Sequence, residues 1–184
     1  MPYSHLNDFP ADVRERAAKI RLAAFDVDGT LTDGKLTLGA GGRETKSFHV
    51  ADGLGLRLLE QYGIAVAFIT ARPGTVVVAR ARELGLQHVF VNVKDKLKCL
   101  DALSAKLGVS REEIAFMGDD LPDLRALAAA GLAVAPANAH PWVRERVHWR
   151  TQHAGGAGAA RELCDLILAA RGHADAIIEQ YTGA

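Results

Sequence analysis

The sequence predicts an α/β fold built on a doubly wound parallel sheet with helices on both faces. Short apolar runs of the kind that form buried strands alternate with helical patterns four or five times along the 184 residues. Strands that are connected through helices pair in parallel, and both faces of such a sheet are covered. Polar and acidic residues follow several of these runs, at the carboxyl edge where open parallel sheets bind ligands.

Residues 20–25 are expected to form the first strand, after a short helix over residues 8–19. Asp26 and Asp28 follow directly, and positions i and i+2 at the end of a strand point to the same side. A hard cation such as Mg²⁺ would neutralise two carboxylates held this close, or one of them could stay protonated for acid–base chemistry. A nucleophilic aspartate that accepts a phosphoryl group needs both a cation beside it and a neighbouring acid that carries a proton. The simpler alternative is a plain Asp28-Gly29 turn.

Composition narrows the class of protein. Lys plus Arg and Asp plus Glu each total 22, so no net charge favours binding to nucleic acid or to a membrane surface. Cys99 and Cys164 have no CxxC partner, which favours buried thiols in a reducing compartment. The sequence shows no signal-peptide pattern and no apolar run long enough to cross a bilayer. We therefore expect a cytoplasmic protein that forms a single domain over residues 1–184.

Residues 34–50 predict a β-hairpin inserted after the first strand. Two segments in which polar and apolar residues alternate flank a glycine-rich turn at residues 39–42. The unpaired edges of an exposed hairpin need protection. The hairpin is therefore expected to pack on its own domain or to pair with another chain.

The rest of the chain continues the alternation. Helices are expected over residues 54–62, 75–84, 92–107, 124–130 and 163–170, and strands over residues 64–69, 88–91, 114–117, 131–135 and 147–150. A C-terminal helix and tail span residues 157–184. In this region the glycine-rich segment 155–162 is expected to be flexible and the last dozen residues to be loosely held.

Three later strands are also followed by chemically suggestive side chains. Thr70 follows the second strand, where its hydroxyl either binds a phosphate or caps the next helix. Lys96 lies shortly after the third strand and either reaches the pocket or belongs to a solvated face of lysines. After the fourth strand comes GDDLPD, in which Asp119 and Asp120 are more charge than a helix cap needs. We expect them to be cation ligands that face the first acidic pair.

The order DVDGT, Thr70, Lys96 and GDDLPD resembles the four motifs of the haloacid dehalogenase superfamily of phosphotransferases. The resemblance spans residues 26–123 and implies a Rossmann-like sheet and Mg²⁺ as cofactor. Many members carry a cap domain after the first or second motif. Only the hairpin at residues 34–50 fits the first position here, and residues 70–96 leave no room in the second, so we expect no cap domain.

The resemblance implies a role for each motif residue. Asp26 would be the nucleophile that forms an aspartyl-phosphate. Asp28 would be the general acid that protonates the leaving oxygen and then the base that activates water. Asp119 would hold Mg²⁺ together with Asp26 and the main-chain carbonyl of Asp28.

The other motif residues would support this chemistry. Thr70 and Lys96 would bind phosphoryl oxygens, and Lys96 would also offset the charge of the nucleophile. Asp120 and Asp123 would not contact the substrate but would support the metal and Lys96. Phosphoryl transfer depends mostly on positioning and charge stabilisation, which a cation, a lysine and a hydroxyl supply.

A more detailed resemblance, to the family of phosphatases that act on 3-deoxy-D-manno-octulosonate 8-phosphate, runs nearly from end to end. It is carried by TDG at residues 32–34, FHVADGLG at 48–55, TAR at 70–72, NAHP at 138–141 and GGAGAARELCDLIL at 155–168. It implies release of phosphate from an eight-carbon sugar acid in lipopolysaccharide biosynthesis. It also implies a capless homotetramer whose hairpins form a barrel beside the active sites, so that a neighbouring subunit covers each site.

The same resemblance implies a set of substrate-binding residues. An anionic sugar acid needs cations, and arginine binds a carboxylate or phosphate through two parallel N–H groups, although an exposed helix arginine can also be a plain surface charge. Arg161 could reach a neighbouring site through the glycine-rich tail. Thr30 in place of valine and His49 in place of asparagine depart from the family pattern and bear on fine substrate selectivity. The implied residues are His49, Val50, Ala51, Asp52, Gly53, Arg57, Arg72, Arg80 and Lys96.

Two other functions fit part of the pattern. A phosphatase for a nine-carbon sugar acid 9-phosphate shares every catalytic motif, but Arg57, Arg72, Arg80 and the GGAGAARE segment favour the eight-carbon substrate. A non-catalytic oligomerisation module, related to those of sugar-nucleotide synthetases, would not need the motif aspartates, threonine and lysine, which are all present. A nucleic-acid binder would need a basic patch or an aromatic platform, and the sequence has neither.

Overall fold

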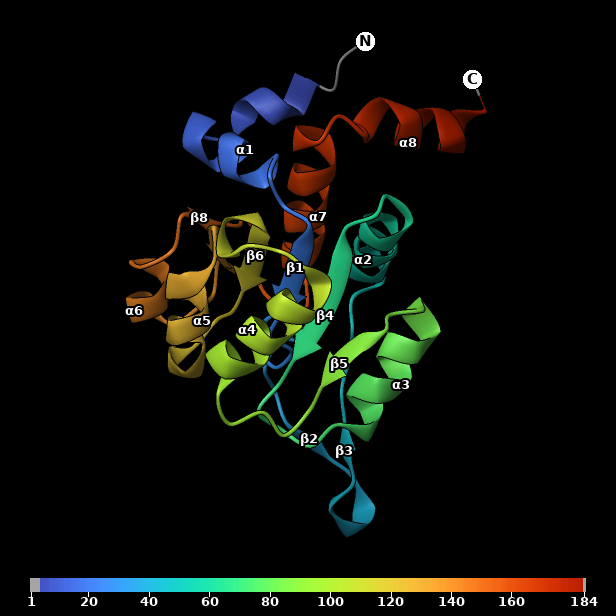
Figure 1. The fold of residues 1–184 in the computed structure, drawn as a ribbon. Coiled ribbons are helices and arrows are strands. Elements are labelled where there is room, and N and C mark those ends of the chain that lie inside the picture. The colour runs from blue at the N-terminus through green and yellow to red at the C-terminus, as the bar shows by residue number, and fades with distance from the viewer. Residues whose placement is uncertain (1–3, 184) are drawn as a thin grey trace.

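The computed structural model describes residues 4–183 and contains a six-stranded parallel sheet between two layers of helices (Figure 1). The strand order is β5-β4-β1-β6-β7-β8, and every neighbouring pair is parallel. The order reverses between β1 and β6, which is the switch point of a doubly wound sheet. The predicted fold class is confirmed. The strands are β1 Leu22–Phe25, β4 Ala65–Ile69, β5 His88–Phe90, β6 Ile114–Met117, β7 Leu132–Ala135 and β8 Trp149–Arg150.

Helices cover both faces of the sheet, and each layer encloses its own cluster of buried apolar side chains. The central strands β1 and β6 are buried along their whole length, as expected for strands covered on both faces. One layer contains α1 Ala11–Ala17, α2 Val50–Gln61, α3 Thr75–Leu84 and α7 Ala159–Ala170, and the other contains α4 Lys96–Leu107, α5 Leu124–Ala129 and α6 Pro141–Arg144.

The predicted hairpin is present between β1 and α2. Its strands β2 Thr37–Leu38 and β3 Glu44–Thr45 pair antiparallel around the 3₁₀ turn η2 Ala40–Gly42. It projects away from the body of the molecule (Figure 1). The structure describes no further insertion between β4 and α4 beyond α3 and β5, in agreement with the expectation that no cap domain is present.

Several expected element boundaries were wrong. The helix predicted over residues 8–19 is shorter: α1 begins at Ala11, directly after Pro10, and Asp8 ends the preceding 3₁₀ turn η1 Ser4–Asp8, because proline fits best before or at the first turn of a helix. Helix α7 begins at Ala159, four residues earlier than expected, and the supposed loose tail forms α8 Ala174–Thr182. The remaining short elements are the 3₁₀ turns η3 Arg111–Glu113 and η4 Leu121–Asp123.

Gly155 and Gly156 are packed, although their composition suggested flexibility. The Gly156 N–H donates to the Thr30 carbonyl at 3.1 Å, and the Gly155 N–H donates to Asn138 Oδ1 at 2.9 Å. A Cβ at position 155 would lie 1.8 Å from the carbonyl oxygen of Gly29. Glycine is therefore needed here for a close approach to the loop that follows β1.

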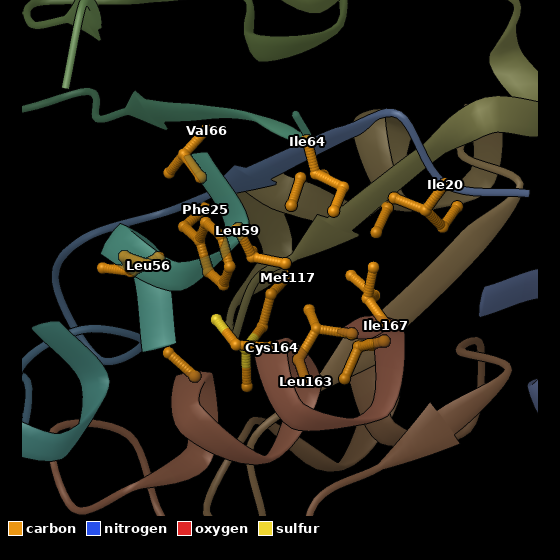
Figure 2. Close-up of a cluster of buried hydrophobic side chains, with 14 of the residues drawn as sticks. Ile20, Phe25, Leu56, Leu59, Ile64, Val66, Met117, Leu163, Cys164 and Ile167 are labelled. Atoms are coloured by element: carbon orange, nitrogen blue, oxygen red, sulfur yellow. The ribbon is translucent and has the colours of Figure 1, made fainter. Parts of the chain in front are cut away.

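Helices α2 and α7 pack closely over the central strands. Figure 2 shows Leu56 and Leu59 of α2 together with Leu163 and Cys164 of α7. Gly55 allows the approach, because a Cβ there would lie 2.9 Å from the Cβ of Cys164. None of the helices within residues 4–183 is long and apolar enough to span a membrane.

Replacing Gly55 with valine is expected to lower the free energy of unfolding by about 1–3 kcal/mol, because the added methyl groups overpack the contact between α2 and α7. Urea denaturation followed by circular dichroism measures the change. Gln61→Ala, an exposed substitution on the same helix, is the control and should stay within about 0.5 kcal/mol of the wild type. Equal stability of Gly55→Val and wild type would contradict the role given to this contact.

Candidate active site

The carboxyl ends of β1, β4 and β6 bring predicted catalytic side chains to one edge of the sheet. Asp26 and Asp28 follow β1, Thr70 follows β4 and Asp119 comes two residues after β6. The β1 and β6 strands flank the switch point, which is where open parallel sheets generally bind their ligands.

Lys96 lies at the centre of this edge. Its side chain is 6% exposed, and Nζ donates to Asp26 Oδ1 at 2.5 Å and also to Asp123 Oδ1. Burial alone would lower the pKa of Lys96, but the charges of Asp26 and Asp123 raise it above its ordinary value. Lys96 is therefore a fixed cation against Asp26, and the alternative of a solvated lysine was wrong.

Asp123 holds the loop after β6 in place. Its Oδ2 accepts the backbone N–H groups of Asp119 at 3.0 Å and Asp120 at 3.2 Å, while its Oδ1 accepts from Lys96. These contacts place Asp123 behind the site, where it orients both Lys96 and the Asp119 backbone. The carboxylate of Asp120 is exposed and accepts the Leu121 N–H at 2.8 Å, so the supporting role expected for Asp120 stays a prediction.

Asp119 packs against the loop that carries the first acidic pair. The Thr30 hydroxyl donates to Asp119 Oδ1 at 3.1 Å. Gly29 has φ +93°, and a Cβ at this position would lie 2.1 Å from Asp119 Oδ2. The glycine of the DxDG motif therefore does more than reverse the chain, because only a residue without a side chain lets Asp119 approach this closely.

Three carboxylates gather at this point, and the single charge of Lys96 does not balance their negative charge. Ligand oxygens of Asp26, Asp119 and Asp123 lie within 4.8 Å of one another. Burial, followed by the charge of Asp123, raises the pKa of Asp119 to about 6. The same two causes raise the pKa of Asp26 above its ordinary range, against the opposing effect of Lys96. Both oxygens of Asp123 already accept hydrogen bonds, so Asp26 and Asp119 are the carboxylates that fit a hard divalent cation such as Mg²⁺.

Asp28 is held by different partners. The Thr70 hydroxyl donates to Asp28 Oδ2 at 3.4 Å, and Thr70 Oγ1 accepts the Arg72 N–H at 3.2 Å. Helix α3 begins at Thr75 with Gly74 before it, so the alternative that Thr70 caps this helix was wrong. The Thr70 hydroxyl instead faces the carboxylate predicted to act as acid and base.

The hairpin supplies two charged residues that the sequence analysis did not select. Lys46 Nζ forms ion pairs with Asp28 and Glu44, and Arg72 Nη2 donates to Glu44 Oε2 at 2.9 Å. Glu44 and Lys46 are two residues apart, so the alternation of the hairpin strand places them on one face. The sequence could therefore show that Glu44 and Lys46 share one face of the hairpin, but it could not show whether that face points toward Asp28 or toward solvent.

The expected substrate-binding residues divide into two groups. Asp52 and Gly53 are buried, and Gly53 lies against Arg80, since a Cβ there would be 2.3 Å from Arg80 Nη2. The Arg80 guanidinium lies 5.8 Å from the centroid of the Phe48 ring, which suits a cation–π contact. In contrast His49, Val50 and Arg57 are exposed and Ala51 is half-buried.

Asp52 links the start of α2 to the start of α7. Its Oδ1 accepts the Arg161 N–H at 2.8 Å, and within the described residues its buried Oδ2 has no hydrogen-bond partner. Burial raises the pKa of Asp52, although the Arg161 N–H opposes the shift. The Arg161 side chain donates to Asp165 Oδ1 at 2.7 Å, so its predicted reach into a neighbouring site stays a prediction.

Comparison with known proteins identifies the class. A family model described as haloacid dehalogenase-like hydrolase matches residues 89–163. The 3-deoxy-D-manno-octulosonate 8-phosphate phosphatase KdsC of Yersinia pestis is 45% identical over 160 residues, 87% of this chain and 86% of that protein. The KdsC of Escherichia coli K12 is 43% identical over 90% of this chain and 88% of its own length.

Solved structures agree with this result. A hypothetical protein from Xanthomonas campestris has a TM-score of 0.95 and 56% identity, covering 98% of this chain and 99% of that one. The 3-deoxy-D-manno-octulosonate 8-phosphate phosphatase of Moraxella catarrhalis, in complex with magnesium, phosphate and KDO, has a TM-score of 0.91 and 42% identity, covering 94% and 99%.

The chain is a haloacid dehalogenase-like hydrolase. Within this class it belongs to the family of proteins named 3-deoxy-D-manno-octulosonate 8-phosphate phosphatase.

Replacing Asp119 with asparagine is expected to raise the melting temperature of the metal-free protein by about 2–4 °C near neutral pH. The folded-state pKa of about 6 lies above the ordinary pKa of an aspartate, so the ionised carboxylate becomes a growing cost to stability as pH rises through about 6. The difference between variant and wild type should therefore shrink at about pH 5.

Added Mg²⁺ is expected to raise the melting temperature of the wild type and not that of Asp119→Asn, because a ligand stabilises only a fold that binds it. Differential scanning fluorimetry with Mg²⁺ and with a chelator measures both effects. Glu112→Gln, at an exposed acid away from the cluster, is the control and should respond like the wild type. Equal Mg²⁺ responses in all three proteins would count against Asp119 as a ligand.

Proposed function

We propose that this protein is a Mg²⁺-dependent phosphatase that hydrolyses 3-deoxy-D-manno-octulosonate 8-phosphate to the free sugar acid and phosphate. The observation that carries the proposal is the buried ion pair between Lys96 and Asp26 beside Asp119. Proteins named 3-deoxy-D-manno-octulosonate 8-phosphate phosphatase are 42–45% identical to this chain over most of its length, and they support the choice of substrate.

Asp26 would act as the nucleophile in the first step. A carboxylate oxygen of Asp26 attacks phosphorus, and the bond between phosphorus and the sugar oxygen breaks. Asp28 donates its proton to that leaving oxygen. Lys96 and Thr70 bind phosphoryl oxygens, and Lys96 also favours the ionised form of Asp26 before the attack.

Water would complete the cycle in the second step. Asp28, now ionised, takes a proton from a water molecule that attacks the phosphorus of the aspartyl-phosphate. The bond between phosphorus and the Asp26 oxygen breaks, and Asp26 is regenerated. Asp26, Asp119 and the main-chain carbonyl of Asp28 would hold Mg²⁺, which supplies positive charge for the phosphoryl oxygens.

Arginines beside this centre would recognise the sugar acid. Arg72 is anchored to Glu44 near Asp28, and Arg80 lies against Gly53 at the start of α2. Guanidinium groups suit the carboxylate of a keto acid because they donate two parallel hydrogen bonds. His49, Val50, Ala51, Asp52 and Arg57 would complete the binding surface.

The hairpin supports the proposal that the protein is a homotetramer. Leu36 and Leu38 on the hairpin are 54% and 65% exposed, and Val50 and Leu54 at the start of α2 are 83% and 37% exposed. Large apolar side chains exposed on a projecting element favour pairing with another chain. Hairpins from neighbouring subunits would cover these residues and exclude water from the site. We place the enzyme in the cytoplasm, in lipopolysaccharide biosynthesis.

Phosphate release from a panel of substrates tests the function. With Mg²⁺ the protein should prefer the eight-carbon 8-phosphate over a nine-carbon sugar acid 9-phosphate and over hexose phosphates, and a chelator should remove the activity. Asp26→Asn should lose essentially all turnover with an unchanged circular dichroism spectrum, because an amide cannot form the acyl phosphate.

Each alternative result has a distinct meaning. A preference for the nine-carbon compound would keep the mechanism and change the substrate. Absence of release from any compound would favour a non-catalytic oligomerisation module. Normal Mg²⁺-dependent turnover by Asp26→Asn would refute the nucleophile.

Leu38→Asp is expected to dissociate the tetramer, because it places a charge in the surface formed by paired hairpins. Size-exclusion chromatography with light scattering measures the mass, and activity should fall with it. Trp142→Asp, at a 59% exposed residue on α6, is the matched control and should leave the mass unchanged. A wild-type monomer, or a Leu38→Asp tetramer, would count against this assembly.

A further inference from the structure

We propose that Lys46 is a positioning residue for Asp28, which makes the hairpin part of the catalytic machinery as well as a surface for assembly. The inference rests on the proposed function in one respect, that Asp28 is the general acid of the first step.

Lys46 is buried in a place where lysine is normally exposed. It follows β3 on the projecting hairpin, yet its side chain is only 2% exposed. A lysine is almost never buried unless it is paired, because removing its charge from water is costly. Two carboxylates provide the pairing, since Nζ contacts both Asp28 Oδ1 and Glu44 Oε1.

The contacts of Lys46 form a closed ring with the end of β4. Glu44 Oε2 accepts from Arg72 Nη2 at 2.9 Å, and the Arg72 N–H donates to Thr70 Oγ1 at 3.2 Å. The Thr70 hydroxyl returns to Asp28 Oδ2 at 3.4 Å. Lys46 and Thr70 therefore each hold one of the two carboxyl oxygens of Asp28.

This arrangement controls where the Asp28 carboxyl points. The Asp28 side chain is 20% exposed and follows a strand end, so packing alone does not fix its rotamer. A general acid must lie within hydrogen-bond reach of the oxygen that it protonates, and a displacement of about 1 Å can cost about 10²-fold in rate. Without Lys46, the hydrogen bond from Thr70 would be left to orient Asp28.

The contacts that hold Asp26 do not involve Lys46. Lys96 binds Asp26 and Asp123 from α4, and Thr30 binds Asp119. Loss of Lys46 should therefore impair protonation of the leaving group more than attack by Asp26. This separation can be measured, because some leaving groups need no proton.

Lys46→Met tests the proposal with two substrates. The octulosonate 8-phosphate has an alkoxide leaving group that needs a proton, whereas p-nitrophenolate leaves without one. The ratio kcat/KM covers phosphoryl transfer to Asp26 and excludes the later step in which Asp28 acts as a base. We expect kcat/KM to fall by about 10²-fold for the sugar phosphate and by less than about tenfold for p-nitrophenyl phosphate. Equal losses on both substrates, or no loss, would overturn the role of Lys46.

Companion variants separate positioning from folding. Lys46→Arg keeps a charged donor for Asp28 and Glu44 and should recover part of the lost preference for the sugar phosphate. Lys35→Met is the control, because Lys35 lies on the same hairpin, is 81% exposed and pairs with Asp33. It should leave kcat/KM for both substrates unchanged. A Lys46→Arg enzyme with the substrate ratio of Lys46→Met would contradict positioning by charge.

Asp28→Asn distinguishes failure of this inference from failure of the proposed function. Undiminished turnover of the sugar phosphate by Asp28→Asn would overturn both, because no general acid would then be at this position. Strong impairment by Asp28→Asn with equal losses for Lys46→Met on the two substrates would overturn the inference alone. Melting temperatures within a few degrees of the wild type should accompany the kinetic changes, since the ring lies outside both apolar clusters.

Discussion

Repulsion among buried carboxylates is the constraint around which this active site is built. Asp26, Asp119 and Asp123 converge because parallel strands deliver their following loops to one edge, and burial makes each negative charge costly. Lys96 offsets part of the cost by pairing with two of them. The remaining excess of negative charge favours a cation, and the cation in turn favours a phosphate. The rigid, fully buried strands β1 and β6 keep the carboxylates from moving apart.

The two acids of the DxDG motif have different surroundings although they are two residues apart. Asp26 meets a lysine from α4, inside the domain, and is almost fully buried. Asp28 meets a lysine from the hairpin and a hydroxyl from the end of β4, in a more exposed place. A nucleophile benefits from desolvation and a fixed charge, whereas a proton carrier must reach the leaving group and then water. The separation of partners therefore supports a separation of function.

Much of this arrangement could be predicted from the sequence. Apolar runs located the strands, and the topology rule for parallel sheets then placed Asp26, Asp28, Thr70 and Asp119 at one edge. The orientation of the hairpin could not be predicted, because strand alternation gives two faces and only tertiary packing selects the one that carries Lys46 inward. The helix α8 was also missed, since a short amphipathic segment without an apolar run resembles a tail.

The glycine-rich segment before α7 shows why composition misled. Gly155 and Gly156 follow a strand and precede a helix, where flexibility is the usual interpretation, yet the Gly156 N–H binds the Thr30 carbonyl and the Thr30 hydroxyl binds Asp119. The C-terminal part of the chain thus braces the loop after β1 from outside. At its other end, the Arg161 N–H binds Asp52 at the start of α2. Glycine serves close approach here, so the geometry of the acidic cluster depends on residues more than a hundred positions away in the chain.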